Sequence, residues 1–266
     1  MEATLARPDG CQIFYRIDDY TDPWREPETA LFVHGLAESG EAWRAWVPYF
    51  AGRFRTVRID LRGFGRSTPM AADYTFTMDA LLDDFVALIR HLDCPRVHLI
   101  GAKSGGSMTL KFAAEHPELV HTLTAVTPPL TSATGVPEWV AHIEAHGVHD
   151  WAKHTMQGRL GSAVSQAEVD WWVENIQSKT PLSTMRSYLR WVPGLDIRAD
   201  IEKIAAPTLI MTTTGSGLRT VDGVKAWQPR IRNSELLVIE GDAWHAAGAY
   251  PDVCAKAALA HIEKHR

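Results

Sequence analysis

Residues 97–106 decide the fold of this chain, and they read Val97-His98-Leu99-Ile100-Gly101-Ala102-Lys103-Ser104-Gly105-Gly106. The first part of this stretch is an apolar run typical of a buried strand, and a run with helical periodicity begins at Ser107. Glycines on both sides of Lys103 suit a tight turn and close helix packing, because they carry no side chain. The stretch therefore predicts a strand, a sharp turn with Lys103 at its tip, and a helix.

Similar strand-like and helix-like runs alternate on both sides of this turn. Strands that alternate with helices predict an α/β fold, in which a mostly parallel sheet is flanked by helices on both faces. The predicted strands are Gln12–Arg16, Ala30–His34, Arg55–Asp60, Val97–Ile100, Leu119–Val126, Pro207–Thr212 and Glu235–Ile239, and the main predicted helices are Thr77–Leu92, Ser107–His116 and Val253–Lys264.

Residues 128–193 differ from the rest, because they interrupt the series of strands with helix-like patterns. We interpret them as a helical cap over the carboxyl edge of the sheet, where ligands bind in open α/β folds. Residues 1–127 and 194–266 then form the core. Most of the cap tryptophans are expected to pack within the cap, and one or two to line a pocket. They are Trp139, Trp151, Trp171, Trp172 and Trp191.

Composition excludes several classes of partner. The 266 residues carry a net charge of −5 and no basic cluster, which argues against nucleic acid. No apolar run reaches the ~20 residues of a membrane span, so no membrane partner is expected. The three cysteines, Cys11, Cys94 and Cys254, fit neither a disulfide framework nor a metal site. With no apolar signal region in residues 1–10, these features predict a cytoplasmic protein.

Several further motifs occur in a fixed order along nearly the whole chain, together with the turn at Lys103. In that order they resemble the α/β-hydrolase superfamily, and within it small capped members of the 3-oxoadipate enol-lactonase type. The motifs are Phe32-Val33-His34-Gly35, Asp60-Leu61-Arg62-Gly63-Phe64-Gly65-Arg66-Ser67, His116-Pro117-Glu118, Pro207-Thr208-Leu209-Ile210 and Gly241-Asp242-Ala243-Trp244-His245.

This resemblance implies a catalytic serine, acid and histidine in that chain order, with the serine in a G-x-S-x-G elbow. His245 matches the base, but the elbow reads G-A-K-S-G and places Lys103 at the nucleophile position. Ser216 stands where the acid is expected, and Asp222 is the nearest downstream carboxylate. The resemblance therefore implies a hydrolase whose nucleophile and acid have both been replaced.

The resemblance also implies an oxyanion hole made by the backbone N–H groups of Leu36 and Ser104, with His34 orienting the first of these loops. Ser104 could itself be the nucleophile in a loose A-x-S-x-G frame. That alignment needs a shift of one residue, which also moves residues 116–118 out of step. Lys103 aligns without a gap and is the favoured residue.

Three effects are expected to lower the pKa of Lys103: the positive end of a helix dipole, burial, and the lack of the family's acid. A neutral amine near pH 7 would form an imine with a ketone or aldehyde. Attack on an ester would instead leave a stable amide, so a serine-type acyl-enzyme cycle is excluded. Alternatively, Lys103 could hold a substrate carboxylate or enolate without a covalent bond while His245 activates water.

The leading hypothesis is an enzyme that acts on a small carbonyl, lactone or ester substrate by hydrolysis or C–C bond cleavage. One alternative is a Schiff-base lyase or decarboxylase that uses Lys103, and another is a ligand-binding pseudoenzyme without activity. A hydrolase that uses Ser104 also stays open. Lys103 could also be an introduced residue, although Ser216 at the acid position argues against a single introduced change.

A small-molecule substrate is the only partner that the sequence predicts, and no oligomeric state follows from it. No organic cofactor is expected, since no nucleotide-binding glycine pattern occurs. His142, His146 and His149 have helical spacing that could bind a metal, but a solvated helix face is the preferred interpretation. Arg159, Arg186 and Arg190 could attract a carboxylate, although most such arginines lie at the surface.

Overall fold

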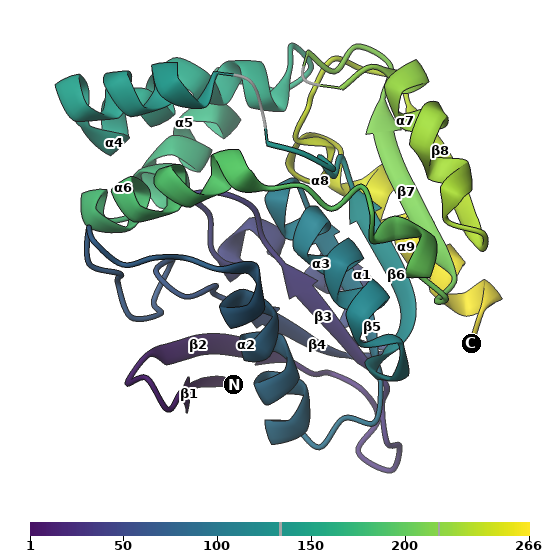
Figure 1. Cartoon of the computed structure of the whole chain (residues 1–266). Helices are drawn as coiled ribbons and strands as arrows, with labels where there is room; N and C mark the ends of the chain where they lie inside the picture. Colours follow the sequence, from purple (N-terminus) through teal and green to yellow (C-terminus); the bar gives the residue numbers. More distant parts are fainter. Residues whose placement is uncertain (133–134, 218) are drawn as a thin grey trace.

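The computed structural model describes residues 1–132, 135–217 and 219–266 (Figure 1). Its strands are β1 (Glu2–Ala6), β2 (Gln12–Asp18), β3 (Thr29–Val33), β4 (Arg55–Ile59), β5 (Val97–Ala102), β6 (Val120–Val126), β7 (Thr208–Thr213) and β8 (Ser234–Ile239). Its α-helices are α1 (Val47–Phe50), α2 (Met78–His91), α3 (Ser104–Glu115), α4 (Val136–Leu160), α5 (Gln166–Asn175), α6 (Leu182–Trp191), α7 (Val221–Trp227), α8 (Ala246–Ala249) and α9 (Pro251–Lys264).

The described strands form one eight-stranded sheet in the order β1-β2-β4-β3-β5-β6-β7-β8. Neighbours from β4 to β8 pair in parallel, while β2 is antiparallel to both β1 and β4. The carboxyl ends of β3, β5, β6, β7 and β8 therefore meet at one edge of the sheet. The predicted α/β class is confirmed.

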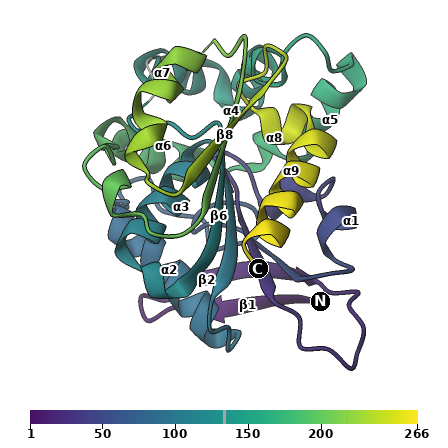
Figure 2. The ribbon, with the colours of Figure 1, turned by 90° about the vertical axis from the view of Figure 1, so that its right-hand side faces the viewer.

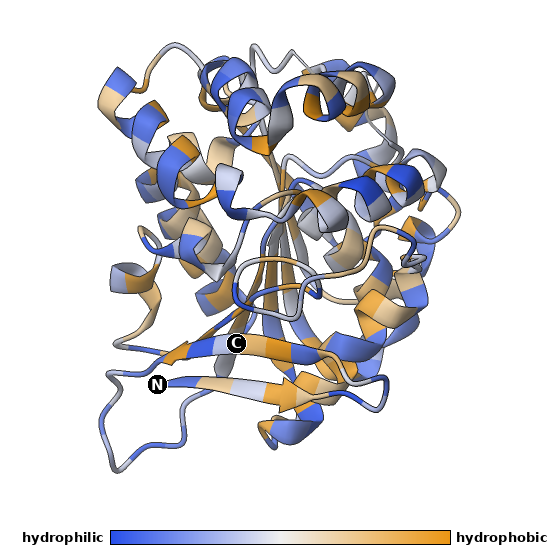
Figure 3. Ribbon diagram, turned by 90° about the vertical axis from the view of Figure 1, so that its left-hand side faces the viewer, coloured by the Kyte–Doolittle hydropathy of each residue, from blue (hydrophilic) through white to orange (hydrophobic). Residues whose placement is uncertain are grey.

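Helices cover both faces of this sheet. Figure 2 shows α1 and α9 on one side and α2 and α3 on the other. Every residue of β3, β5 and β7 is buried, as expected for central parallel strands that are covered on both faces. Coloured by hydropathy, the strands in the interior are largely apolar, whereas polar residues colour much of the helices around them (Figure 3).

Helices α4, α5 and α6 lie between β6 and β7 in the sequence and above the carboxyl edge of the sheet (Figure 1). Helix α4 is kinked at Gly147, whose φ of 84° is not helical. These helices occupy the interval that the sequence assigns to a cap, although residues 133–134 of that interval lie outside the described residues. That they form a separate domain stays a prediction.

Strand β1 and the start of helix α3 differ from the sequence prediction. Strand β1 was not expected, because Glu2–Ala6 has only small or half-buried apolar side chains on its inward face. Helix α3 begins at Ser104 and not at Ser107, so it includes two glycines with poor helix propensity. The close approach of α3 to β3 explains them, since a Cβ on Gly105 would lie 2.3 Å from the carbonyl oxygen of His34.

Among the described helices, none combines the length and the apolar character that a membrane span requires.

Candidate active site

Lys103 occupies the sharp turn between β5 and α3. Its φ of 54° and ψ of −127° are rare for a residue with a side chain, and such strain is typical of functional turns. Its backbone N–H donates to the carbonyl of Val126 at 3.0 Å, which ties the turn to β6. Ser104 already belongs to the helix. The structure thus places Lys103, and not Ser104, at the tip of the turn.

The side chain of Lys103 joins two other buried ionisable groups. Its Nζ forms an ion pair with Oε1 of Glu38, and the same oxygen lies 3.0 Å from Nε2 of His245. The second carboxylate oxygen of Glu38 accepts a hydrogen bond from the N–H of Gly35 at 3.0 Å. Lys103, Glu38 and His245 are 6%, 2% and 2% exposed. We call these three residues the buried triad.

Burial and the charges of the neighbours set the protonation of the buried triad. Burial, reinforced by Arg159 and opposed by Glu38, lowers the pKa of Lys103 to about 8. Burial alone would raise the pKa of Glu38, but the Lys103 ammonium and His245 hold it well below its ordinary value. Burial and the Lys103 charge lower the pKa of His245. At pH 7 the site therefore contains an ammonium, a carboxylate and a neutral imidazole.

The pKa of Lys103 is shifted in the expected direction, but the shift is too small to leave the amine mainly neutral at pH 7. A pKa of about 8 leaves roughly a tenth of the amine neutral at pH 7. The reason is Glu38, a carboxylate from a distant part of the chain that stabilises the ammonium. The only local sign of this role in the sequence is that Glu38 is an acidic residue in the same loop as Leu36, directly after β3.

The residues proposed to replace the family's acid do not reach His245. Nδ1 of His245 makes no hydrogen bond to any described residue. Ser216 lines the cavity and its hydroxyl accepts from the N–H of Arg219 at 3.4 Å. Asp222 lies in the first turn of α7 with an exposed side chain. The carboxylate next to His245 is instead Glu38, which comes from the opposite part of the sheet edge.

Other contacts hold His245 in place. Its backbone N–H donates to the carbonyl of Arg159 at 2.9 Å, and its ring meets the ring of Trp172 edge to face at 5.0 Å. The hydroxyl of Thr213, at the end of β7, donates to the carbonyl of Ala243 at 2.7 Å. Helix α4 and strand β7 therefore both fix the loop that carries the histidine.

The proposed oxyanion residues lie beside the triad. Leu36 and Ser104 both line the same cavity as Lys103. The side-chain amide of Gln177 donates to the carbonyl of Leu36 at 3.1 Å and fixes that loop. His34 is fully buried: its Nδ1–H donates to the carbonyl of Gly35 at 2.8 Å, and its Nε2 accepts from the N–H of Leu61 at 3.0 Å. These bonds suit a residue that orients the loop.

A cavity of about 70 Å³ adjoins the triad at the carboxyl edge of the sheet, and it is large enough for several water molecules or a small ligand. It is lined by residues of the loops after β3, β5, β6, β7 and β8, of helix α4 and of the segment that follows α6. The lining residues are Leu36, Lys103, Ser104, Thr127, Pro129, Ser132, Val136, Trp139, Arg159, Val192, Leu195, Ser216, Arg219 and Trp244.

Arg159 is a second buried cation in this cavity. Its side chain is 1% exposed, and Nε donates to the hydroxyl of Thr155 at 3.2 Å. Its guanidinium lies 4.5 Å from the ring centroid of Trp151 and 5.0 Å from that of Trp244. One terminal nitrogen, Nη2, has no hydrogen-bond partner among the described residues. Burial, opposed by Glu38, lowers the pKa of Arg159 to about 10, so it stays charged.

The other cap residues considered for ligand binding lie away from the cavity. Arg186 pairs with Glu144, and Arg190 donates to the carbonyl of Ala72. His142 pairs with Asp150 at 2.8 Å and His149 with Glu174 at 2.7 Å, as polar residues of a partly solvated helix surface do. His146 lies beside His142, with their ring centroids 5.0 Å apart.

Comparison with known proteins agrees with this architecture. A family model described as alpha/beta hydrolase fold matches residues 30–252. A non-heme chloroperoxidase from Kitasatospora aureofaciens is 28% identical over 260 residues, which cover 88% of this chain and 89% of that protein. Epoxide hydrolase 3 of Xenopus tropicalis is 38% identical over 103 residues, but these span only 39% of this chain and 28% of that protein.

Among solved structures, the enol-lactonase of Burkholderia xenovorans LB400 has a TM-score of 0.84 at 19% identity. The aligned region covers 98% of this chain and 100% of that chain. At this identity the likeness concerns the fold alone. The family match, however, includes the elbow, the oxyanion loop and the loop of His245. The chain therefore belongs to the α/β-hydrolase fold family.

Proposed function

We propose that this protein is a hydrolase that acts on a small ester, lactone or other activated carbonyl compound carrying a carboxylate group. The fold and the relatives indicate a hydrolase-type enzyme. The observation that carries the finer proposal is the buried triad beside a cavity, because perturbed ionisable groups in a pocket are typical of catalytic sites. We further propose that α4, α5 and α6 act as a cap over this site.

The proposed reaction needs no covalent intermediate. The oxygen of a water molecule bonds to the carbonyl carbon while His245 takes the proton of that water, and the carbonyl oxygen receives the electron pair of its π bond. The imidazolium formed lies next to Glu38, whose carboxylate stabilises it as the family's acid would. When the bond to the leaving oxygen breaks, that oxygen takes the proton back from His245. The products are a carboxylic acid and an alcohol, or one hydroxy acid from a lactone.

Lys103 is proposed to stabilise the negative charge that develops on the carbonyl oxygen, together with the N–H groups of Leu36 and Ser104. A buried ammonium is effective in this role, because a low dielectric strengthens charge interactions. Its ion pair with Glu38 keeps Lys103 protonated at pH 7. These features favour the electrostatic role over imine formation.

The charges in the cavity support a carboxylate on the substrate. Lys103 and Arg159 are both buried and cationic, whereas Glu38 is the only carboxylate that contacts Lys103 among the described residues. The unpartnered Nη2 of Arg159 offers hydrogen bonds that a carboxylate can accept. A carboxylate bound there would offset the excess of positive charge.

The first test is turnover of a panel of small carboxylate-bearing esters and lactones by wild type, Lys103→Ala and Lys103→Arg. We expect Lys103→Ala to lower kcat by about 10²–10³, the usual effect of losing one oxyanion-stabilising group. Lys103→Arg keeps the charge and is expected to retain activity within about tenfold of wild type. Lys111→Ala is the matched control, because Lys111 lies in α3 outside the cavity and pairs with Glu115 of that helix and with Asp200. Unchanged activity in Lys103→Ala would refute the proposal.

The lowered pKa of Lys103 also favours a second candidate, an imine-forming lyase, and pH dependence separates the two. Electrostatic catalysis needs the ammonium, so its rate falls as pH rises through about 8. Imine formation needs the neutral amine, so its rate rises over the same range. An imine would also leave a borohydride-reduced adduct on Lys103 in wild type and none in Lys103→Arg. Saturable binding of these compounds without turnover would instead indicate a pseudoenzyme.

A further inference from the structure

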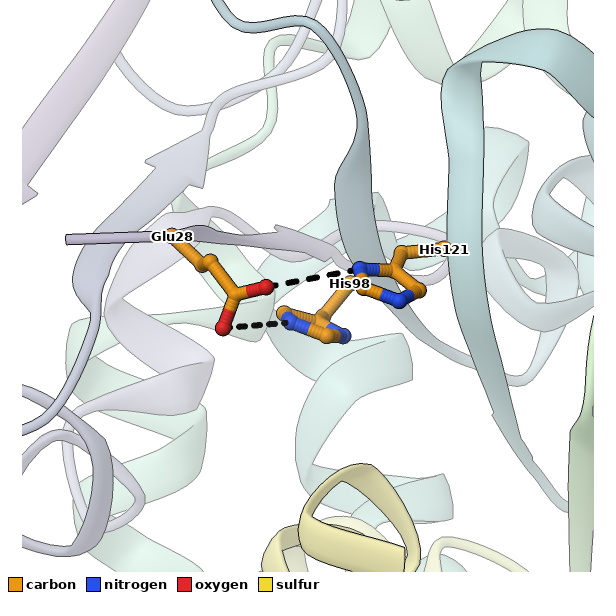
Figure 4. Close-up of side chains that lie close together, drawn as sticks. All are labelled: Glu28, His98 and His121. Atoms are coloured by element: carbon orange, nitrogen blue, oxygen red, sulfur yellow. Dashed lines mark ion pairs between the residues drawn. The ribbon is translucent and has the colours of Figure 1, made fainter. Parts of the chain in front are cut away.

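Two histidines and a glutamate meet at the amino edge of the sheet, opposite the buried triad. Glu28 directly precedes β3, His98 is the second residue of β5, and His121 is the second residue of β6. Figure 4 shows the Glu28 carboxylate facing both rings. We call these three residues the amino-edge cluster. His98 and Lys103 are five residues apart along the strand, roughly 16 Å at ~3.3 Å per residue.

The register of the sheet explains why these side chains meet. Ala30 pairs with His98, and Glu28 points to the same face as Ala30 because strand side chains alternate. The pairing of β5 with β6 shifts after Val97, so that Val97 pairs with Val120 and His98 with Thr122. His121 is therefore the extra residue of a β-bulge, a feature that commonly re-aims a side chain.

The geometry of the amino-edge cluster suits a divalent metal ion. Nε2 of His98 lies 3.7 Å from Oε2 of Glu28, and Nδ1 of His121 lies 3.5 Å from Oε1. The three candidate ligand atoms lie within 4.8 Å of one another. Ligands about 2.1 Å from a tetrahedral zinc ion are themselves about 3.4 Å apart, so small side-chain movements would complete such a site.

A buried nitrogen without a hydrogen-bond partner points to a missing ligand at this cluster. Nε2 of His98 is buried and makes no hydrogen bond to any described residue. The other ring nitrogen, Nδ1, lies 2.9 Å from the hydroxyl of Thr122, an outer contact of the kind that orients metal-binding histidines. The rings of His98 and His121 are stacked, with centroids 4.9 Å apart and planes at 17°, so both present their edges to the carboxylate.

The partial exposure of the amino-edge cluster also suits metal binding, because an ion must reach the site from solvent. His98 is 1% exposed, whereas the side chains of Glu28 and His121 are 33% and 30% exposed. One cation already contacts the carboxylate: Nε of Arg266 lies 2.5 Å from Oε2 of Glu28. The Arg266 side chain is 49% exposed and can move away. It would therefore compete with a metal ion for Glu28.

We propose that Glu28, His98 and His121 bind a first-row divalent metal ion, zinc above all, with water in the remaining position. Two imidazoles and one carboxylate are ligands that zinc accepts. The ion would connect β3, β5 and β6 at their amino ends, so its role is structural and does not depend on the proposed reaction.

The test is a calorimetric titration of the chelator-treated full chain with zinc chloride. All proteins carry His265→Gln, because Glu235, His261 and His265 form a second group of possible ligands. In this background we expect one saturable site. Adding His121→Gln, at a half-buried position that tolerates a polar side chain, should weaken binding by at least about tenfold. Adding His142→Gln is the matched control and should change nothing, because His142 pairs with Asp150 in α4.

A variant of Arg266 gives the most specific test of the zinc site. Removing a competing charge with Arg266→Gln should tighten zinc binding by roughly two- to fivefold. Zinc should also raise the midpoint of thermal unfolding in the His265→Gln background and not with His121→Gln added. Two results would overturn the proposal: no saturable binding in the His265→Gln background, or equal binding with and without His121→Gln.

Discussion

At the scale of single residues, Glu38 determines the protonation state of Lys103. A buried lysine alone would lose its proton near neutral pH, since burial penalises the charged form. The Glu38 carboxylate contacts both the ammonium and His245 through one oxygen. It therefore keeps Lys103 protonated, and it lies close enough to His245 to stabilise a positive charge on that ring. One carboxylate outside the expected chain position thus serves both partners.

Glu38→Gln tests this double role. Loss of the negative charge removes the attraction that opposes burial, so the pKa of Lys103 should fall further below its ordinary value. We expect kcat to fall by about 10²–10⁴, because His245 loses the group that stabilises its protonated form. The falling limb of the pH–rate profile, which reports the Lys103 ammonium, should move to lower pH. Steady-state kinetics across pH measure both effects.

The matched control for that variant is Glu41→Gln. Glu41 belongs to the same segment, but it pairs with Arg16 and Arg58 at a half-exposed position. Its replacement should leave the pH–rate profile unchanged. An equal shift in both variants would mean that long-range charge, and not contact with Glu38, sets the pKa of Lys103.

At the scale of elements, the close packing of α3 on β3 holds the elbow in place. Gly105 lies where an added Cβ would be 2.3 Å from the carbonyl oxygen of His34 and 2.5 Å from that of Val33. Both oxygens belong to the backbone of a buried segment and cannot move far. The glycine is therefore required by the approach of helix to strand, and that approach sets the position of Lys103.

Gly105→Ala should consequently lower the free energy of unfolding by about 2–3 kcal/mol or more, the usual cost of overpacking against a rigid neighbour. Gly158→Ala in α4 is the control, because nothing lies within 4 Å of its added Cβ. That change should be neutral or should stabilise the helix by up to ~1 kcal/mol. Urea unfolding of both variants measures the difference. Equal stability of the two variants would contradict the packing argument.

At the scale of the whole molecule, the site exists only where α4 meets the carboxyl edge of the sheet. Arg159 comes from the end of α4, and Lys103 comes from the turn after β5. The two cations face one cavity, and Arg159 contributes to the lowered pKa of Lys103. Substrate recognition is therefore expected to depend on the helices above the sheet as much as on the sheet itself.

Arg159→Met tests this expectation. We expect KM for a carboxylate-bearing substrate to rise by about 10–100-fold, while KM for its neutral methyl ester changes little, because a buried charge-assisted hydrogen bond is lost. Arg186→Met is the control, since Arg186 pairs with Glu144 at the exposed surface of the same helices. If both substrates lose affinity equally, Arg159 shapes the cavity and does not recognise the anion.

The sequence by itself determined the layered α/β architecture and the place of Lys103 at the elbow. Both follow from local rules, since apolar periodicity specifies strands and helices, and glycines mark the tight turn. It also indicated which loops carry Leu36, Ser104 and His245. It did not predict β1, whose small side chains give little periodic signal.

Only the tertiary structure decided the chemistry of the site. Glu38 and Lys103 are 65 positions apart in the chain, and the bulge that brings His121 to His98 depends on the register of two strands. Whether Arg159, Arg186 or Arg190 faces the cavity depends on the rotation of its helix over the sheet. Such contacts arise from packing between distant segments, and a pattern within one segment cannot specify them.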